Sequence, residues 1–188
     1  MRIIAGLAKG RNLISPSDGV RPTSDRAREA LFSTLESEFG SMRDLQFLDL
    51  YCGSGAVSAE ALSRGAAFVK AVDKDERATS VARSNHEMLG QIQGVGSSSV
   101  ITMAVARFLE RSAENKFDIV FLDPPYELGN DEVINTLNLL SKNAFVKPGS
   151  VVAIERDSRA KSFEWPTGFV ALKERKYGAA TIYYAEAC

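Results

Sequence analysis

The chain has 188 residues, of which 45% are hydrophobic and 25% are charged, and its net charge at pH 7 is −1. These values are typical of a globular protein, and they predict a single domain over residues 1–188 with a sizeable buried core. They exclude a generally polybasic nucleic-acid-binding protein. No apolar run reaches the roughly 18 residues that a membrane span needs.

Cysteine and histidine usage narrows the chemistry further. Cys52 and Cys188 form no disulfide framework, and the single histidine, His86, without a Cys/His cluster argues against a metal site. His86 lies in a predicted helix, and we expect it on the solvated surface. The N-terminal residues lack the apolar stretch of a signal peptide. We therefore expect a cytoplasmic protein with reduced thiols that engages neither a metal nor a membrane.

The first forty residues predict an arm followed by a helix. Short apolar stretches at 2–5 and 11–14, separated by glycines, predict a small hairpin or a pair of extended arms. A loop follows, after which Thr23 or Ser24 can cap a helix that ends near Gly40.

From residue 46 the pattern alternates between strands and helices. The predicted strands are 47–50, 68–72, 100–103, 117–122 and 151–154, and the predicted helices are 56–64, 76–89, a short one through 108–109, and 131–140. Residues 90–99 are predicted to be a mobile loop and 147–149 a turn, whereas 169–176 and 181–185 predict an antiparallel edge hairpin. The alternation predicts an α/β fold with a doubly wound, mostly parallel, seven-stranded sheet that carries helices on both faces.

Basic residues gather at the start of the chain. Residues 1–28 hold six basic and two acidic residues, a net charge of +4, so the other 160 residues sum to −5. A local patch is enough to contact phosphates, so the asymmetry indicates a site for an anionic partner, with a solvated basic face as the alternative. Arg26 and Arg28, near the start of the first helix, face a phosphate, a cofactor carboxylate or solvent.

Three acidic residues and one alanine stand at predicted strand ends: Asp49, Asp73, Asp123 and Ala104. In a doubly wound sheet the ligand binds beyond the carboxyl ends of the strands, near the point where the strand order reverses. We therefore expect these four residues to line one edge of the sheet.

A glycine loop joins the first strand to its helix. Gly53 and Gly55 allow the backbone to approach a ligand, but Ser58 occupies the place of the third glycine of a dinucleotide-binding loop. Asp73, eighteen residues after Gly55, has the approximate spacing of a ribose-binding carboxylate. An acidic strand end suits an amine and a sugar, which favours S-adenosylmethionine over a pyrophosphate cofactor. Cys52 has no neighbouring base to activate it and is interpreted as a packing residue.

The stretch Asp123-Pro124-Pro125-Tyr126 follows the apolar strand 117–122. The two prolines carry no N–H and force the residues before them into extended geometry. The result is a stiff corner with a carboxylate, backbone carbonyls and an aromatic ring. Such a surface suits an amino group on a flat ring, although a proline-capped strand end is the plainer interpretation of the four residues alone.

Taken together, these motifs resemble the RsmD family of small-subunit ribosomal RNA guanine-N2 methyltransferases, a branch of the class I S-adenosylmethionine-dependent fold. The resemblance runs nearly end to end. Its motifs are Met1-Arg2-Ile3-Ile4-Ala5-Gly6, Gly10-Arg11, Arg21-Pro22-Thr23, the glycine loop with Glu60-Ala61-Leu62-Ser63-Arg64-Gly65-Ala66, the strand through Tyr126, and Arg175-Lys176-Tyr177-Gly178 with Thr181. The N-terminal pieces are the family-specific ones, because a DPPY-type motif also marks DNA adenine methyltransferases.

The resemblance implies a Rossmann-like class I methyltransferase that transfers a methyl group from S-adenosylmethionine to the N2 amine of a guanine in 16S ribosomal RNA or the small subunit. It implies a monomer in which residues 1–22 are an RNA-binding arm and residues 23–188 are the catalytic core. The implied catalytic residues are Asp123, Pro124 and Tyr126. The implied cofactor-binding residues are Asp49, Tyr51, Gly53, Ser54, Gly55, Asp73, Lys74, Ala104, Val105 and Asp123. The implied RNA-binding residues are Arg2, Lys9, Arg11, Arg21, Arg26, Pro125 and Tyr126.

Two positions depart from the family pattern. Many relatives carry Phe where this chain has Tyr126, and either ring can stack on a base. Related enzymes often offer a polar or acidic side chain where this chain has Ala104 and Val105, so here we expect only backbone contact and apolar packing with the adenine.

Three alternative functions remain open from the sequence. The first is an amino methyltransferase that acts on adenine in DNA, on another RNA or on a protein amine. The second is a non-catalytic RNA-binding protein that kept a cofactor fold. The third is a nicotinamide oxidoreductase, which Asp49 and Ser58 disfavour.

Overall fold

The computed structural model describes residues 1–15, 25–160 and 163–188. Its helices are α1 (Asp25–Phe39), α2 (Ala56–Ser63), α3 (Glu76–Gly90), α4 (Val105–Leu109) and α5 (Asn130–Lys142). Its strands are β1 (Gln46–Leu50), β2 (Phe68–Asp73), β3 (Ser97–Thr102), β4 (Phe117–Leu122), β5 (Val146–Asp157), β6 (Phe169–Tyr177) and β7 (Ala180–Ala187). Among the described residues, no helix is both long and apolar enough to cross a bilayer.

The strands form one seven-stranded sheet in the order β3-β2-β1-β4-β5-β7-β6. The first four neighbouring pairs in this order are parallel, and β7 pairs antiparallel with both β5 and β6. The predicted mostly parallel sheet with an antiparallel edge hairpin is therefore confirmed. The strand order reverses between β1 and β4, which is where a doubly wound sheet binds its ligand.

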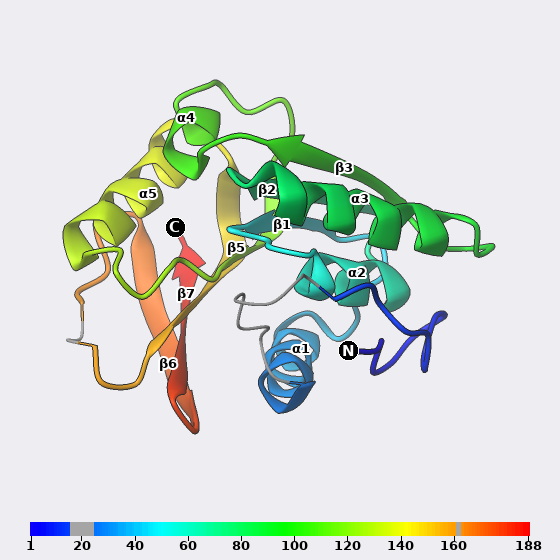
Figure 1. Cartoon of the computed structure of the whole chain (residues 1–188). Helices are drawn as coiled ribbons and strands as arrows, with labels where there is room; N and C mark the ends of the chain where they lie inside the picture. Colours follow the sequence, from blue (N-terminus) through cyan, green and yellow to red (C-terminus); the bar gives the residue numbers. More distant parts are fainter. Residues whose placement is uncertain (16–24, 161–162) are drawn as a thin grey trace.

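Helices cover both faces of the sheet (Figure 1). On one face α1, α2 and α3 pack over a core that includes Leu31, Phe32 and Phe47. On the other face α4 and α5 pack over a core that includes Leu122 and Leu137. Because successive strand residues point to opposite faces, the parallel strands need apolar residues on both sides, which explains their continuous hydrophobic runs.

Residues 1–15 of the N-terminal arm fold back on themselves and pack against α2. They have one antiparallel bridge, between Arg2 and Asn12, instead of two regular strands. The carboxylate of Glu60 accepts hydrogen bonds from the N–H groups of Ile4 and Ala5, at 2.8 and 2.9 Å. A buried acidic residue of α2 therefore holds the arm by its backbone. Ile3, Ala8 and Leu13 pack into the core, whereas the basic side chains of Arg2, Lys9 and Arg11 stay exposed.

Arg28 is not at the surface, so the prediction that it faces a phosphate, a carboxylate ligand or solvent is wrong. Its side chain is fully buried, forms an ion pair with Asp25 at 2.9 Å and lies 3.7 Å from Glu60. It also donates a hydrogen bond to the carbonyl of Arg2. A buried guanidinium needs such partners, and here it joins α1 to the arm.

Two strands begin several residues before their predicted starts. β3 begins at Ser97, within the predicted loop, because Ser97–Ser99 pair in parallel register with Phe68–Lys70. β5 runs from Val146 and includes the predicted turn at 147–149, where its register with β4 shifts. In β3, pairing with a neighbouring strand overrides residues of low strand propensity, whereas in β5 the residues of the predicted turn form the irregularity in its pairing with β4.

Candidate active site

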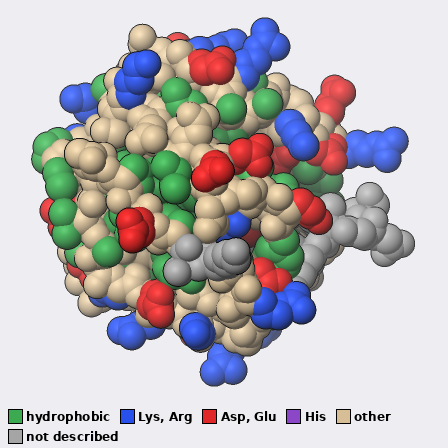
Figure 2. Space-filling view, turned by 90° about the vertical axis from the view of Figure 1, so that its left-hand side faces the viewer, with side chains coloured by type: hydrophobic (Ala, Val, Ile, Leu, Met, Phe, Trp, Pro, Cys, Tyr) green, Lys and Arg blue, Asp and Glu red, His purple; other side chains and the backbone are tan. Residues whose placement is uncertain are grey.

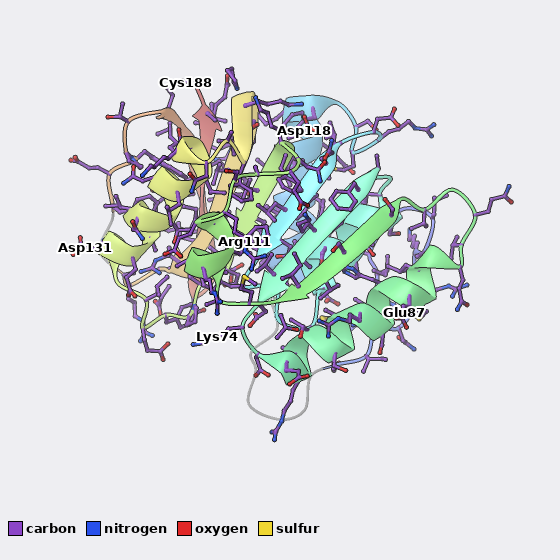
Figure 3. All side chains as sticks on the ribbon, turned by 90° about the horizontal axis from the view of Figure 1, so that it is seen from above. Lys74, Glu87, Arg111, Asp118, Asp131 and Cys188 are labelled. Atoms are coloured by element: carbon purple, nitrogen blue, oxygen red, sulfur yellow. The ribbon has the colours of Figure 1, made fainter. Side chains whose placement is uncertain are left out.

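A cavity of about 830 Å³ opens at the carboxyl ends of β1, β2, β4 and β5. Its volume is in the range that holds a drug-sized ligand. Figure 3 shows the two ends of the strands. Lys74, just after β2, lies at the carboxyl ends, where the cavity opens, and Asp118, near the start of β4, lies at the opposite end of the sheet.

Most of the residues that line this cavity fall into two sets, and Ala27, Ala56, Val57 and Phe121 complete the lining. The β1–β2 half consists of Asp49, Tyr51, Cys52, Gly53, Ser54, Asp73, Lys74, Ala104, Val105 and Ala106. The β4–β5 half consists of Asp123, Pro124, Pro125, Tyr126, Glu127, Leu128, Glu155, Tyr177 and Ala180. Every residue predicted to be catalytic or cofactor-binding lines the cavity except Gly55.

Hydrogen bonds within the β1–β2 half order its glycine loop. The carboxylate of Asp73 accepts from the N–H of Gly53 at 2.9 Å and from the N–H of Asp75 at 3.0 Å. Each carboxylate oxygen has a second lone pair, so Asp73 can still accept from ligand hydroxyl groups. Gly53 has φ +52°, and nothing lies within 4 Å of a Cβ added to it, so its backbone faces open space.

Asp49 lies at the base of the same half and is almost completely buried. It accepts a hydrogen bond from the N–H of Ser58 at 3.0 Å. Burial raises the pKa of its carboxyl to about 7, partly offset by the hydrogen bonds from Ser58 and reinforced by the charges of Asp123 and Asp73. A cation in the cavity would stabilise the ionised form of Asp49.

Gly55 is not among the residues that line the cavity, and its close neighbours are on α3 and α2. It has φ +73°, and a Cβ there would lie 2.9 Å from the Cβ of Ala82 and 3.2 Å from Nε2 of His86, both on α3. The glycine loop is therefore pressed against α3 on the side away from the cavity.

The prediction of a solvated His86 is wrong. The side chain is buried, and its Nε2 lies 3.0 Å from Oγ of Ser58. Burial lowers its pKa to about 4, so the ring is neutral near pH 7. The spacing of Ala78, Ala82 and Leu89 with His86 marks one face of a helix, and this pattern could have predicted its burial.

The β4–β5 half is built around the proline corner. Asp123 donates its N–H to the carbonyl of Leu50, so it continues the β1–β4 ladder before the prolines end it. Pro124 is buried, whereas Pro125 and Tyr126 are exposed, with 42% of Tyr126 open to solvent. An exposed ring beside a fixed carboxylate is available to stack on a flat ligand.

Arg156 tethers the loop that follows the corner. Its guanidinium donates to the carbonyl of Leu128 at 2.7 Å and lies 3.4 Å from Oδ1 of Asn130. Burial lowers the pKa of this group. Because Leu128 lines the cavity, β5 holds one wall of the site through Arg156.

The cavity is strongly acidic. Among its described lining residues, five are Asp or Glu and only Lys74 is basic. An anionic pyrophosphate would be repelled there, which counts against a dinucleotide, whereas a sulfonium with an amino group would be attracted. The described residues also contain no cluster of three or more His, Cys, Asp or Glu that could hold a metal ion. The lining therefore fits S-adenosylmethionine.

Cys52 is not built as a nucleophile. Both cysteines are free, and burial, with the charges of Asp49 and Asp73, raises the pKa of the Cys52 thiol well above its usual value. The thiol is therefore neutral, as its interpretation as a packing residue requires.

Among the described residues, the predicted RNA-binding cations do not line the cavity. Arg2, Lys9, Arg11 and Arg26 are exposed, and Arg21 lies outside the described residues. Arg26 is the neighbour in sequence of Ala27, which lines the cavity. On the face of the molecule seen in Figure 2, many Lys and Arg side chains project at the outline, and several acidic side chains lie nearer the centre.

Asn85 links the arm to the glycine loop, and the sequence did not single it out. Its side chain accepts from the N–H of Ile14 at 2.8 Å and donates to the carbonyls of Ile14 and Ser54, at 3.1 and 3.0 Å. Asn85 is fully buried on the inner face of α3. A polar residue on an apolar helix face was the available signal.

Comparison with known proteins identifies the family. A family model described as "conserved hypothetical protein 95" matches residues 1–186. The chain is 33% identical to proteins named ribosomal RNA small subunit methyltransferase D. The match covers 95% of this chain and 89% of the Haemophilus influenzae protein, and 100% of this chain and 91% of the Escherichia coli protein. The solved structure of Escherichia coli yhhF superposes with a TM-score of 0.85 at 30% identity, covering 100% of this chain and 97% of that one. The fold is therefore that of a Rossmann-like class I methyltransferase, and the chain belongs to the RsmD family.

Proposed function

We propose that this protein transfers a methyl group from S-adenosylmethionine to the N2 amine of a guanine in small-subunit ribosomal RNA. The observation that carries this proposal is the acidic cavity in which the glycine loop and the proline corner meet, in a chain of the RsmD family. The names of the matched relatives support ribosomal RNA as the substrate, and a cytoplasmic location goes with that substrate.

The β1–β2 half would hold the cofactor. Asp73 accepts the ribose hydroxyls, the Gly53 backbone lies against the ligand, and Ala104 and Val105 pack on the adenine. Asp49, at the base, stabilises positive charge. When bound, S-adenosylmethionine supplies an electrophilic methyl group on a sulfonium sulfur, which becomes a neutral thioether when the methyl group is transferred.

The β4–β5 half would orient the base. The lone pair of a guanine amine is delocalised into the ring, so the amine is a poor nucleophile. Asp123 and the Pro124 carbonyl accept its two hydrogens, which aims the lone pair, while Tyr126 stacks on the ring. Orientation of this kind can lower a barrier by up to roughly 7–11 kcal/mol in ideal cases. The proton that N2 loses passes to Asp123 or to water.

The arm, residues 1–22, would position the RNA. Phosphate contacts fix orientation without reading sequence, and exposed Arg2, Lys9 and Arg11 suit that role. The target base must be unpaired or flipped to enter the cavity, which favours a loop nucleotide.

The test is methyl transfer with labelled cofactor. The purified protein is incubated with 16S ribosomal RNA, and separately with small subunits, from cells that lack it. The RNA is digested, and the labelled nucleoside is identified against N2-methylguanosine. Label at one guanine is the expected result. Label in adenosine or in ribosomal protein would contradict the proposal. Equal label with the Asp123→Ala protein would show that Asp123 has no role in the transfer.

A further inference from the structure

Glu155 is an acidic residue of the cavity wall to which the proposed mechanism gives no role. It lies near the end of β5, is 5% exposed and lines the cavity. A carboxylate accepts several hydrogen bonds through its two oxygens, so Glu155 can receive one from a donor on a ligand in the cavity.

The strand register places Glu155 beside the proline corner. Leu122 of β4 pairs with Ile154 of β5 in parallel register, so Asp123 and Glu155 are the next residues on adjacent strands. Neighbouring strands lie about 4.7–4.9 Å apart. The two acidic residues therefore stand next to each other at the end of the sheet.

Their side chains also share one face. Phe121 and Ala153 belong to the core under α1–α3, whereas Leu122 and Ile154 belong to the opposite core. Side chains alternate along a strand, so Asp123 and Glu155 both follow the face of Phe121 and Ala153. Both line the same cavity, as this alternation requires.

Glu155 is held firmly in this place. It pairs in the sheet with Ile182 of β7, and the following residue, Arg156, anchors the loop after the corner through the Leu128 carbonyl. The corner, its loop and Glu155 are thus parts of one rigid wall, as recognition of a planar ring requires.

Guanine is the base whose edge matches two adjacent acceptors. Its N1–H donor stands next to the N2 amine, whereas adenine and cytosine carry a ring acceptor next to their amine. An ionised carboxylate accepts but cannot donate. We propose that Glu155 accepts the N1–H of the target base while Asp123 and the Pro124 carbonyl take the amine, so that Glu155 selects guanine. This inference rests on the proposed function.

The test replaces the target guanine by a base analogue that lacks the N1–H donor. 2,6-Diaminopurine keeps the 2-amino group but carries an acceptor at N1. It is placed at the methylated position of 16S ribosomal RNA by ligation of synthetic fragments. The RNA is offered naked or in reconstituted subunits, whichever accepts methyl in the first assay. The wild-type protein should methylate the guanine RNA at least about 100-fold faster than the analogue, because an unmatched polar pair is strongly rejected.

Glu155→Gln tests the residue itself, because the amide can donate to N1 of the analogue. The guanine-to-diaminopurine rate ratio should fall at least about tenfold, and the ratio of RNA affinities, measured by anisotropy with S-adenosylhomocysteine bound, should fall with it. Glu174→Gln, on the exposed part of β6, removes the same charge and should leave both ratios unchanged.

Each outcome decides the question. Equal wild-type rates on the two RNAs overturn the selection of guanine even if the Glu155 variant fails to fold. A Glu155→Gln protein that loses activity on both RNAs by the same factor shows a structural role and overturns the inference. If the wild-type protein transfers no methyl group to the guanine RNA, the proposed function itself is wrong.

Discussion

The two halves of the cavity are stiffened by different means. In the β1–β2 half, Asp73 and Asp49 accept hydrogen bonds from the backbone of the glycine loop and of α2. In the β4–β5 half, prolines remove backbone freedom and Arg156 tethers the loop from the side. The first half therefore depends on acceptors that are already engaged by the protein, and the second presents its acceptors on a rigid backbone. The β1–β2 half therefore suits the binding of the cofactor, and the β4–β5 half suits the orientation of the substrate.

The largest effect on the methylation rate should follow from removal of the Asp123 carboxylate in the β4–β5 half. Asp123→Ala removes the acceptor for the amine, and the methylation rate should fall by roughly 10²–10⁴-fold. Cofactor affinity, measured by calorimetry, should change by less than about tenfold. Asp131→Ala, an exposed acidic residue at the start of α5 (Figure 3), is the matched control and should leave the rate unchanged. Retained methylation by the Asp123 variant would exclude this role.

The β1–β2 half should be destabilised by a substitution that disturbs the packing of the glycine loop against α3. Gly55→Ala adds a methyl group at φ +73° against Ala82 and His86. It should lower the free energy of unfolding in urea by roughly 2–4 kcal/mol, from backbone strain and overpacking together. Gly53→Ala, at φ +52° with open space around it, carries only the backbone term and should cost about 1–2 kcal/mol. Equal losses for the two variants would mean that the contact with α3 is unimportant.

The buried carboxyl of Asp49 should make cofactor binding depend on pH. Its pKa is raised to about 7, so below that pH a proton must leave before a cation is stabilised. Affinity for S-adenosylmethionine should fall by up to about tenfold per pH unit below 7 and level off above it. Calorimetry from pH 5.5 to 8.5 measures this, and Asp49→Asn should flatten the profile. A wild-type profile as flat as that of the variant would refute it.

The buried side chains of Asp49 and His86 should change the free energy of unfolding in opposite directions as the pH rises. For Asp49, whose folded pKa lies above its usual value, the unfolding free energy falls as pH rises from about 4 to 7. For His86, whose folded pKa lies below its usual value, the unfolding free energy rises between about pH 4 and 6.5. Asp49→Asn without cofactor should therefore leave a stability that increases with pH over this range, as urea melts would show.

The smallest effect should come from Arg11 in the arm, because this residue does not line either half of the cavity and is expected to change only RNA binding. Arg11→Ala should weaken RNA binding severalfold and reduce the slope of log affinity against log salt by up to about 1, without changing cofactor affinity. Arg111→Ala, an exposed cation beside α4 on the opposite face of the sheet, is the control. An equal loss for both variants would indicate nonspecific charge attraction.

The sequence alone determined the architecture and most of the cavity lining. Alternating strand and helix periods imply a doubly wound sheet, and the ends of parallel strands must meet at one edge. Asp49, Asp73 and Asp123 could therefore be grouped without coordinates, as could the proline corner, because proline geometry is local. The sequence motifs also identified the family.

Only the tertiary structure decided what the buried polar residues hold. The apolar face of α3 was a sequence signal for the burial of Asn85 and His86, but their partners on the glycine loop, the arm and α2 come from long-range packing. Arg28 is buried because it meets the arm and Glu60. Gly55 could not be separated from Gly53, because both have positive φ and only the approach of α3 distinguishes them. Glu155 joined the site through the register of β5 against β4, a long-range pairing that no local pattern specifies.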